Sequence, residues 1–133
     1  MREIYLKGFG ICVRESQPAA VMTSYNLLNG IHTSQRRDLI EDVLRCEFGF
    51  QGIVMTDWVT GGSFLSKSAK YPVPHAGRVA AAGGDLFMPG CGKDLEECKQ
   101  LLASGELPRR QLEINATRVY RLSRKLNGET NSQ

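Results

Sequence analysis

Short apolar runs alternate with amphipathic segments along this chain, and this rhythm is typical of βα units that build a parallel sheet. Three such runs, at 19–25, 52–56 and 85–88, predict strands. Pro89 and Gly90 end the third run, because proline cannot continue a paired strand. The pattern therefore predicts an α/β fold with about three parallel strands.

The segments around these runs predict about five helices. The clearest helix carries acidic residues in its first turns and an apolar stripe that ends at Phe48, and Gly49 stops it. Thr33 or Ser34 is predicted to cap its N-terminus. The other predicted helices span 4–14, 74–82, 93–103 and 107–126.

Two loops are predicted at the C-terminal ends of the first two strands. The segment 26–33 reads as a loop with a turn at Asn29-Gly30, and 60–73 reads as an irregular loop rich in Gly, Ser and Lys. Loops that follow the strands of a parallel sheet commonly carry functional residues.

The alternation within the second strand fixes the direction of its side chains. Ile53, Met55 and Asp57 share one face, whereas Val54 and Thr56 share the other. If the first set faces the interior of a barrel, the Asp57 carboxylate projects into the mouth at the C-terminal end of the strand. Barrel enzymes keep their chemistry at that end.

The same alternation is predicted for the first strand. It aligns Val21, Thr23 and Tyr25, so that Tyr25 stands at the height of Asp57 and Met22 points to the opposite side.

Composition narrows the class of protein. A chain of 133 residues with 41% apolar and 23% charged residues suits one soluble globular domain. The net charge is +3, and the basic residues gather only near the C-terminus, at a helical spacing that favours a solvated face over a nucleic-acid site.

No membrane partner is expected, because no apolar stretch approaches the ~20 residues that a bilayer requires. The first seven residues do not resemble a signal peptide. The compartment stays open, with the cytoplasm favoured.

Cysteine and histidine spacing predicts neither a metal nor a cofactor. The chain has no Cys-x-x-Cys pair, and only His32 and His75 could add ligands. Buried or half-buried free thiols are favoured over a disulfide or a zinc site. The four cysteines concerned are Cys12, Cys46, Cys91 and Cys98.

Asp57 and Trp58 are the clearest candidates for functional residues. A carboxylate can attack an anomeric carbon, and an indole face can cover the apolar side of a sugar ring. The residues alone leave two alternatives open, an Asp that caps the turn after its strand and a Trp that packs in the core.

Five ordered motifs resemble glycoside hydrolase family 3, which includes β-glucosidases, β-xylosidases and β-N-acetylglucosaminidases. The resemblance runs from about Met1 to Leu126. The motifs are Arg2-Glu-Ile-Tyr-Leu6, Val21-Met-Thr-Ser-Tyr-Asn26 with Asn29-Gly30, Leu44-Arg45 with Gly49-Phe50, Gly52-Ile-Val-Met-Thr-Asp-Trp58, and Ala82-Gly-Gly-Asp85 with Met88-Pro89.

The resemblance implies a partial TIM barrel, in which the three strands look like the sixth, seventh and eighth of a (β/α)8 barrel. Residues 1–127 would form the C-terminal portion of the catalytic barrel domain, and 128–133 a polar tail. Asp57 occupies the Asp of the family's Ser-Asp-Trp signature, which makes it the implied nucleophile of a retaining mechanism. Thr56 replaces the signature Ser and preserves its hydroxyl.

The resemblance also implies the substrate-binding residues. Trp58 matches the aromatic that forms part of the sugar-binding wall. Tyr25 matches a tyrosine near the nucleophile, where its phenol could hydrogen-bond the carboxylate, although a packing role is the alternative. Met22 lies in the same motif as a further substrate-binding candidate, and no cofactor is implied.

Four other features are not expected to take part in the chemistry. Asp85 begins its strand and so lies at the opposite end from Asp57. His32 is expected in a loop on the rim, and His75 is the weaker candidate for a proton donor. Asn115-Ala-Thr117 fits a glycosylation pattern but falls in a predicted helix.

The expected protein is incomplete as an enzyme. A full barrel takes about 250 residues, and neither the sugar-gripping segment that family members carry upstream nor an acid/base is found here. We therefore expect a segment of a β-glucosidase-like hydrolase of β-linked glycosides that is inactive alone. Exposed strand edges predict a homo-oligomer or missing partner segments. The alternative is a non-catalytic carbohydrate-binding or self-assembling fragment.

Overall fold

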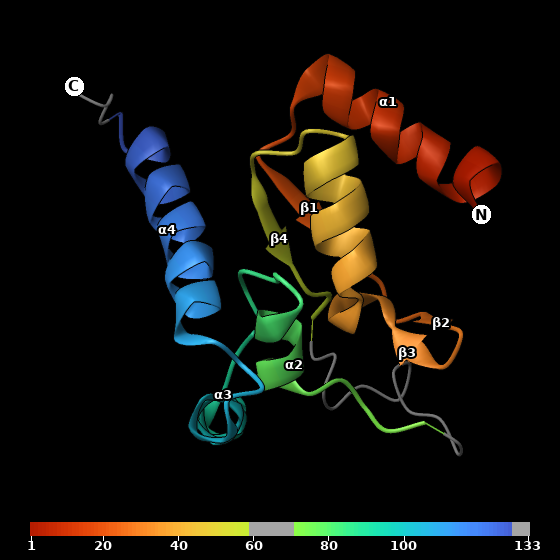
Figure 1. Ribbon diagram of the computed structural model, residues 1–133. Helices are drawn as coiled ribbons and strands as arrows, with labels where there is room; N and C mark the ends of the chain where they lie inside the picture. The colour runs from red at the N-terminus through yellow and green to blue at the C-terminus, as the bar shows by residue number, and fades with distance from the viewer. Residues whose placement is uncertain (59–70, 129–133) are drawn as a thin grey trace.

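The computed structural model describes residues 1–58 and 71–128, and two short parallel strands lie at its centre (Figure 1). These strands are β1 (Ala20–Met22) and β4 (Ile53–Met55). Their pairing continues for one more bond, in which the Thr23 N–H donates to the Met55 carbonyl at 2.9 Å. The first two predicted strands are therefore confirmed, with shorter bounds.

The third predicted strand, at 85–88, is reduced to one parallel bridge between Leu86 and Met55. The Leu86 N–H donates to the Val54 carbonyl at 3.1 Å. The neighbouring Val54 N–H is taken at 2.7 Å by the side chain of Asp85 instead of a backbone carbonyl. The strand does not extend to Met88, because the Met88 N–H donates to the Thr56 hydroxyl at 2.9 Å instead of a backbone carbonyl.

The predicted loop at 26–33 contains a small hairpin. Strands β2 (Leu27–Leu28) and β3 (Ile31–His32) pair antiparallel around the predicted turn. Asn29 and Gly30 have φ angles of 52° and 82°, which is the left-handed conformation that tight hairpin turns require. The turn is confirmed, and strands of two residues are too short for alternation to reveal them.

All five predicted helices are present (Figure 1). The first is continuous from η1 into α1, and the clearest predicted helix is η3, which has π-type hydrogen bonds and ends before Gly49. The bounds are η1 (Arg2–Leu6), α1 (Lys7–Ser16), η3 (Asp38–Glu47), α2 (Ala76–Ala81), α3 (Gly92–Ser104) and α4 (Arg109–Leu126).

The predicted N-cap of η3 is wrong. Thr33 and Ser34 belong to a separate 3-10 turn, η2 (Thr33–Gln35), and η3 begins only at Asp38. The Thr33 hydroxyl donates to the Ser24 carbonyl at 2.9 Å, so it stabilises the hairpin base rather than a helix terminus.

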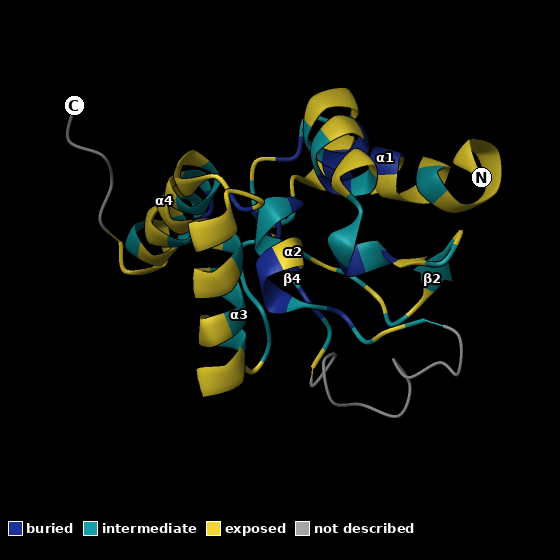
Figure 2. Cartoon of the chain, turned by 60° about the horizontal axis from the view of Figure 1, so that its bottom comes forward, coloured by how far each residue is buried: buried dark blue, intermediate teal, exposed yellow. Residues whose placement is uncertain are grey.

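The core lies between the sheet and the helices on one of its faces. Its buried side chains come from α1, η3, β4 and the segments that follow η3 and α2. Figure 2 shows buried positions along the inner sides of the helices, whereas α3 and α4 expose most of their length. The core cluster is Val13, Ile40, Leu44, Phe50, Val54 and Ala82.

The other face of the sheet is only partly covered, because Ile53 is buried there whereas Met22 is exposed. The register pairs Val21 with Val54, so Val21 packs against the core, and it pairs Met22 with Met55. Met22 is 55% exposed. Met22 therefore shares the face of Asp57, and the predicted alignment of Val21, Thr23 and Tyr25 with that face is wrong. The register of a parallel pair cannot be derived from one strand alone.

The four cysteines are unpaired thiols, and the prediction that they are buried or half-buried is confirmed for one of them and wrong for the other three. Cys12, Cys46 and Cys91 are exposed and Cys98 is half-buried. The first two lie on the outer sides of α1 and η3, where amphipathic helices meet solvent.

No helix within 1–58 and 71–128 combines the length and the apolar character that crossing a bilayer requires. Within the same ranges, no three His, Cys, Asp or Glu side chains gather as metal ligands.

Candidate active site at the strand tips

The carboxyl ends of β1 and β4 lie at the same edge of the sheet because the strands are parallel. This edge brings together the four residues singled out from the sequence. The Tyr25 hydroxyl donates to the Trp58 carbonyl at 2.5 Å and so links the chain after β1 to the chain after β4. We call Met22, Tyr25, Asp57 and Trp58 the tip cluster.

Asp57 is half-buried directly beyond β4. Its Oδ1 accepts the Trp58 N–H at 2.7 Å. This bond is the turn cap that the residues alone left open as an alternative. It also orients the carboxylate, because a backbone donor holds one of the two oxygens at a fixed position.

Trp58 follows this carboxylate in the chain, and Met22 adds apolar surface on the same face of the sheet. Trp58 is 54% exposed, so the alternative of a core tryptophan is wrong. Met22 is exposed to a similar extent on the face that Asp57 shares. A carboxylate next to an exposed indole and thioether can hold a ligand that has both hydroxyl groups and apolar C–H faces.

The opposite end of β4 has a buried ion network. The Asp85 side chain is fully buried, and its Oδ2 accepts Arg45 Nη2 at 2.6 Å and the Val54 N–H at 2.7 Å. Arg118 Nη1 lies 3.3 Å from Asp85 Oδ1 and 3.1 Å from Glu41 Oε1. We call Glu41, Arg45, Asp85 and Arg118 the ion network. Its position supports the structural role predicted for Asp85.

Burial dominates the electrostatics of this network. It raises the pKa of the Asp85 carboxyl above its ordinary value, against the Val54 N–H and the two guanidinium groups, which lower it. Burial likewise lowers the pKa of the Arg45 guanidinium. Opposite charges and hydrogen bonds offset the free-energy cost of removing the Arg45–Asp85 ion pair from water.

Gly83 and Asn115 pack closely against the ion network. A Cβ added to Gly83, whose φ is +96°, would lie 2.1 Å from Glu41 Oε1. The Asn115 amide donates to the carbonyls of Ala80 at 2.9 Å and Gly84 at 3.0 Å, and Asn115 is buried. Asn115 therefore anchors α4 and is inaccessible to a glycan, in agreement with the interpretation of its motif.

The sequence did not single out Arg45 or Arg118 as partners of Asp85. Arg45 appeared only within the Leu44-Arg45 motif, and Arg118 appeared only as one of several basic residues on a predicted helix. Their roles depend on contacts 40 and 33 positions apart in the chain, which helical periodicity cannot reveal.

His32 is buried, so its predicted place in a rim loop is wrong. It lies in β3, and its Nε2 is 3.0 Å from the Pro72 carbonyl. His75 is half-buried, with Nδ1 3.7 Å from Glu97 Oε2. Neither histidine belongs to the tip cluster. Residues 59–70, which hold most of the loop predicted at 60–73, lie outside the described residues.

Comparison with known proteins gives a family match over most of the chain. The model of the "Glycosyl hydrolase family 3 N terminal domain" matches residues 1–122. β-Glucosidase B of Emericella nidulans is 40% identical over 129 residues, which are 96% of this chain. The chain spans only 14% of the length of that relative.

Solved structures agree with this match. β-Glucosidase 3B from Thermotoga neapolitana in complex with glycerol has a TM-score of 0.77 and 35% identity, covering 92% of this chain and 17% of its own. The same enzyme in complex with glucose gives a TM-score of 0.70 and 38% identity, over 86% of this chain and 15% of its own.

Proposed function

The chain belongs to glycosyl hydrolase family 3, and from this premise we propose that it is a segment of a retaining, β-glucosidase-like glycosidase whose nucleophile is Asp57. The observation that carries the proposal is the shared edge of β1 and β4, which holds the Asp57 carboxylate beside the exposed Trp58 and beneath the Tyr25 hydrogen bond. The proposed substrate is a β-linked glycoside.

In the proposed reaction the Asp57 carboxylate attacks the anomeric carbon, and the bond from that carbon to the leaving oxygen breaks. A covalent glycosyl-enzyme forms on Asp57, while a second group about 5 Å away gives the leaving oxygen its proton. Water then attacks the same carbon, gives its proton to the second group, and releases the sugar and the free carboxylate. The second group is not assigned to this chain.

The other members of the tip cluster would hold the sugar. Trp58 would cover the apolar face of the pyranose, and Met22 would extend that apolar surface from the neighbouring strand. Tyr25 would keep the backbone of the tip in place through its bond to the Trp58 carbonyl. The glucose complex of the Thermotoga neapolitana relative supports a hexose as the ligand class.

Within the family domain, we propose that residues 1–127 are the C-terminal part of the (β/α)8 barrel, with β1, β4 and the Leu86 bridge in the places of the sixth, seventh and eighth strands. Residues 128–133 would be a polar tail. The parallel order of the three segments supports this placement, as does the exposure of Met22 on the face opposite the core. We expect the 133-residue chain alone to be inactive, because a carboxylate without an acid partner cleaves natural glycosides poorly.

A second candidate is a non-catalytic carbohydrate-binding or self-assembling fragment. One observation favours it, the exposed apolar surface of η1 and α1. Ile4 is 79%, Tyr5 70% and Phe9 54% exposed, and such surface promotes association with further copies or with partner segments. Self-association and a cytoplasmic location stay predictions.

Labelling with a mechanism-based 2-deoxy-2-fluoro-β-glucoside tests the proposal. In a chain extended to the length of its relatives, the label should attach to the peptide that contains Asp57 and should be absent from Asp57→Asn. Sugar binding that survives in Asp57→Asn, together with no labelled peptide in the parent protein, would favour the second candidate.

A further inference from the structure

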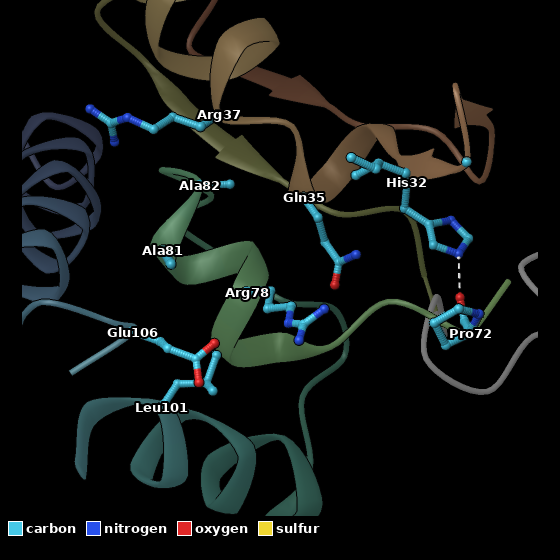
Figure 3. Close-up of a pocket in the computed structure, with 11 residues that line it drawn as sticks. His32, Gln35, Arg37, Pro72, Arg78, Ala81, Ala82, Leu101 and Glu106 are labelled. Carbon is cyan, nitrogen blue, oxygen red and sulfur yellow. Dashed lines mark hydrogen bonds between the residues drawn. The ribbon is translucent and has the colours of Figure 1, made fainter. Parts of the chain in front are cut away.

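A hollow of the molecule lies outside the tip cluster (Figure 3). It has a volume of about 440 Å³ and is lined by residues of the β2–β3 hairpin, η2, α2, α3 and the connection between α3 and α4. No member of the tip cluster lines it. We call it the side groove.

Arg78 supplies hydrogen-bond donors to the side groove. It is an exposed residue of α2, and in the described part of the chain its guanidinium forms no ion pair or hydrogen bond. Guanidinium donors have a fixed fork geometry, which suits a pair of adjacent oxygen atoms on a ligand.

Gln35 lies near Arg78 at the side groove and comes from a different element. Its Oε1 accepts the His75 N–H at 2.8 Å, so the amide is oriented with its oxygen toward the backbone of the protein. The amide NH₂ group is the part of Gln35 left to donate. Figure 3 shows the side chains of Gln35 and Arg78 pointing toward one another from η2 and α2.

Glu106 supplies a hydrogen-bond acceptor to the side groove. This exposed residue lines the groove beside Leu101, and a carboxylate only accepts hydrogen bonds at neutral pH. Leu101, Ala81 and Ala82 add apolar wall between the polar groups. The groove therefore offers donors, an acceptor and apolar surface together.

We propose that the side groove binds a neutral polyhydroxylated ligand, the chemical class of a mono- or disaccharide. Hydroxyl groups both donate and accept, so they satisfy Arg78, Gln35 and Glu106 at once, while the C–H faces of the ligand meet Leu101. A phosphate or carboxylate ligand is negatively charged, so the Glu106 carboxylate repels it. The volume suits a small ligand, because such sites commonly measure about 300–1,000 Å³.

The test is an NMR titration of the ¹⁵N-labelled full chain with cellobiose, and separately with inorganic phosphate. Cellobiose is expected to shift the Arg78 Nε–H, the Gln35 side-chain amide and the Ile31 backbone amide in a saturable way. Arg78→Gln is expected to weaken this binding about tenfold, since hydrogen bonds to a charged group are among the stronger ones.

Arg37→Gln is the matched control. Arg37 also lines the groove, but its side chain points away from the centre and its Nη1 lies 3.5 Å from Gln111 Oε1. Both substitutions remove one positive charge, and only Arg78→Gln should weaken cellobiose binding. Glu106→Ala should weaken cellobiose binding as well, whereas it would strengthen the binding of an anion.

Three results would overturn the inference. They are no saturable shift with cellobiose at these groups, saturable binding of phosphate in place of cellobiose, and equal losses in Arg78→Gln and Arg37→Gln. Cellobiose shifts confined to Trp58 and Tyr25 would overturn the side groove and leave the proposed function intact. Shifts at the groove alone, with no Asp57 labelling by the fluoro-sugar, would overturn the proposed function and leave the side groove intact.

Discussion

Two aspartates mark opposite ends of β4, and their surroundings differ in every respect. Asp85 is fully buried at the N-terminal end, where two arginines and a backbone N–H surround it. Asp57 is half-buried at the C-terminal end, beside an exposed indole and an exposed thioether. The first arrangement serves stability, because each charge is matched inside the protein, and the second leaves a carboxylate where a ligand can reach it.

The same substitution at different aspartates separates these roles. Asp57→Asn, in a chain extended to the length of its relatives, should lower kcat for an aryl β-glucoside by at least about a thousandfold, because it removes the proposed nucleophile. The midpoint of urea unfolding should stay near that of the parent. Steady-state kinetics and urea titration measure the two quantities.

Asp38→Asn is the matched control for this loss of activity. Asp38 is an exposed aspartate at the start of η3 and lies outside both the tip cluster and the ion network. Its substitution should leave kcat unchanged. A similar fall in kcat in both variants would show that the effect at Asp57 is not chemical.

Asp85→Asn should instead lower the stability of the fold. We expect the free energy of unfolding of the 133-residue chain to fall by about 3–5 kcal/mol, because the change breaks a buried ion pair and leaves Arg45 and Arg118 short of a negative partner. Urea unfolding followed by circular dichroism measures this. A loss below about 1 kcal/mol, the range of surface ion pairs, would contradict the structural role of the network.

Gly83→Ala tests how closely the chain surrounds the network. The added methyl group would meet the Glu41 carboxylate, which two arginines hold, at a backbone φ of +96°. We expect a loss of about 2 kcal/mol in the free energy of unfolding, from strain and from displacement of Glu41. Gly49→Ala is the control, because Gly49 has a φ of +75° with no atom near its added Cβ. Equal losses in both variants would reduce the effect at Gly83 to backbone strain alone.

Tyr25→Phe sharpens the account of the tip cluster. It removes the hydrogen bond to the Trp58 carbonyl and keeps the ring. In the extended chain we expect kcat to fall about tenfold, with a loss of about 1 kcal/mol or less in the free energy of unfolding. A change in unfolding free energy with no change in kcat would make Tyr25 a packing residue.

The smallest effect is expected at Asp38. The Arg36 guanidinium, through a side-chain hydrogen bond, lowers the pKa of the Asp38 carboxyl. A lowered pKa stabilises the folded state above the ordinary pKa of the group, and this contribution disappears as pH falls through the folded-state pKa. Because the side chain is 52% exposed, Asp38→Asn should reduce the acid-dependent part of stability by no more than about 0.5 kcal/mol. Urea unfolding at a series of pH values between neutral and acidic conditions measures the difference.

Local patterns predicted much of the fold. The helices and the strand before Asp57 follow from periodicity and from stop signals such as Gly49, since these depend on neighbouring residues. The register of β1 could not be predicted, because it depends on the pairing of Val21 with Val54 across the sheet. The third strand failed for a related reason, since the side chain of Thr56 accepts the Met88 N–H that would have extended the pairing.

The sequence predicted the residues of the tip cluster but not the side groove. Asp57, Trp58, Tyr25 and Met22 stood out through the family resemblance, and the structure brings Tyr25 to Trp58. The side groove had no signal in the sequence, because Gln35, Arg78 and Glu106 come from three separate elements and none belongs to a motif. Surface sites assembled from distant segments become visible only once the chain is folded.

The most direct test of the central claim is the mass of the peptide that contains Asp57 after reaction of the extended chain with the 2-deoxy-2-fluoro-β-glucoside. We expect one fluoro-sugar on Asp57, and no label at Asp85 or Asp38. A label on a different carboxylate, with Asp57 unmodified in an active enzyme, would contradict it.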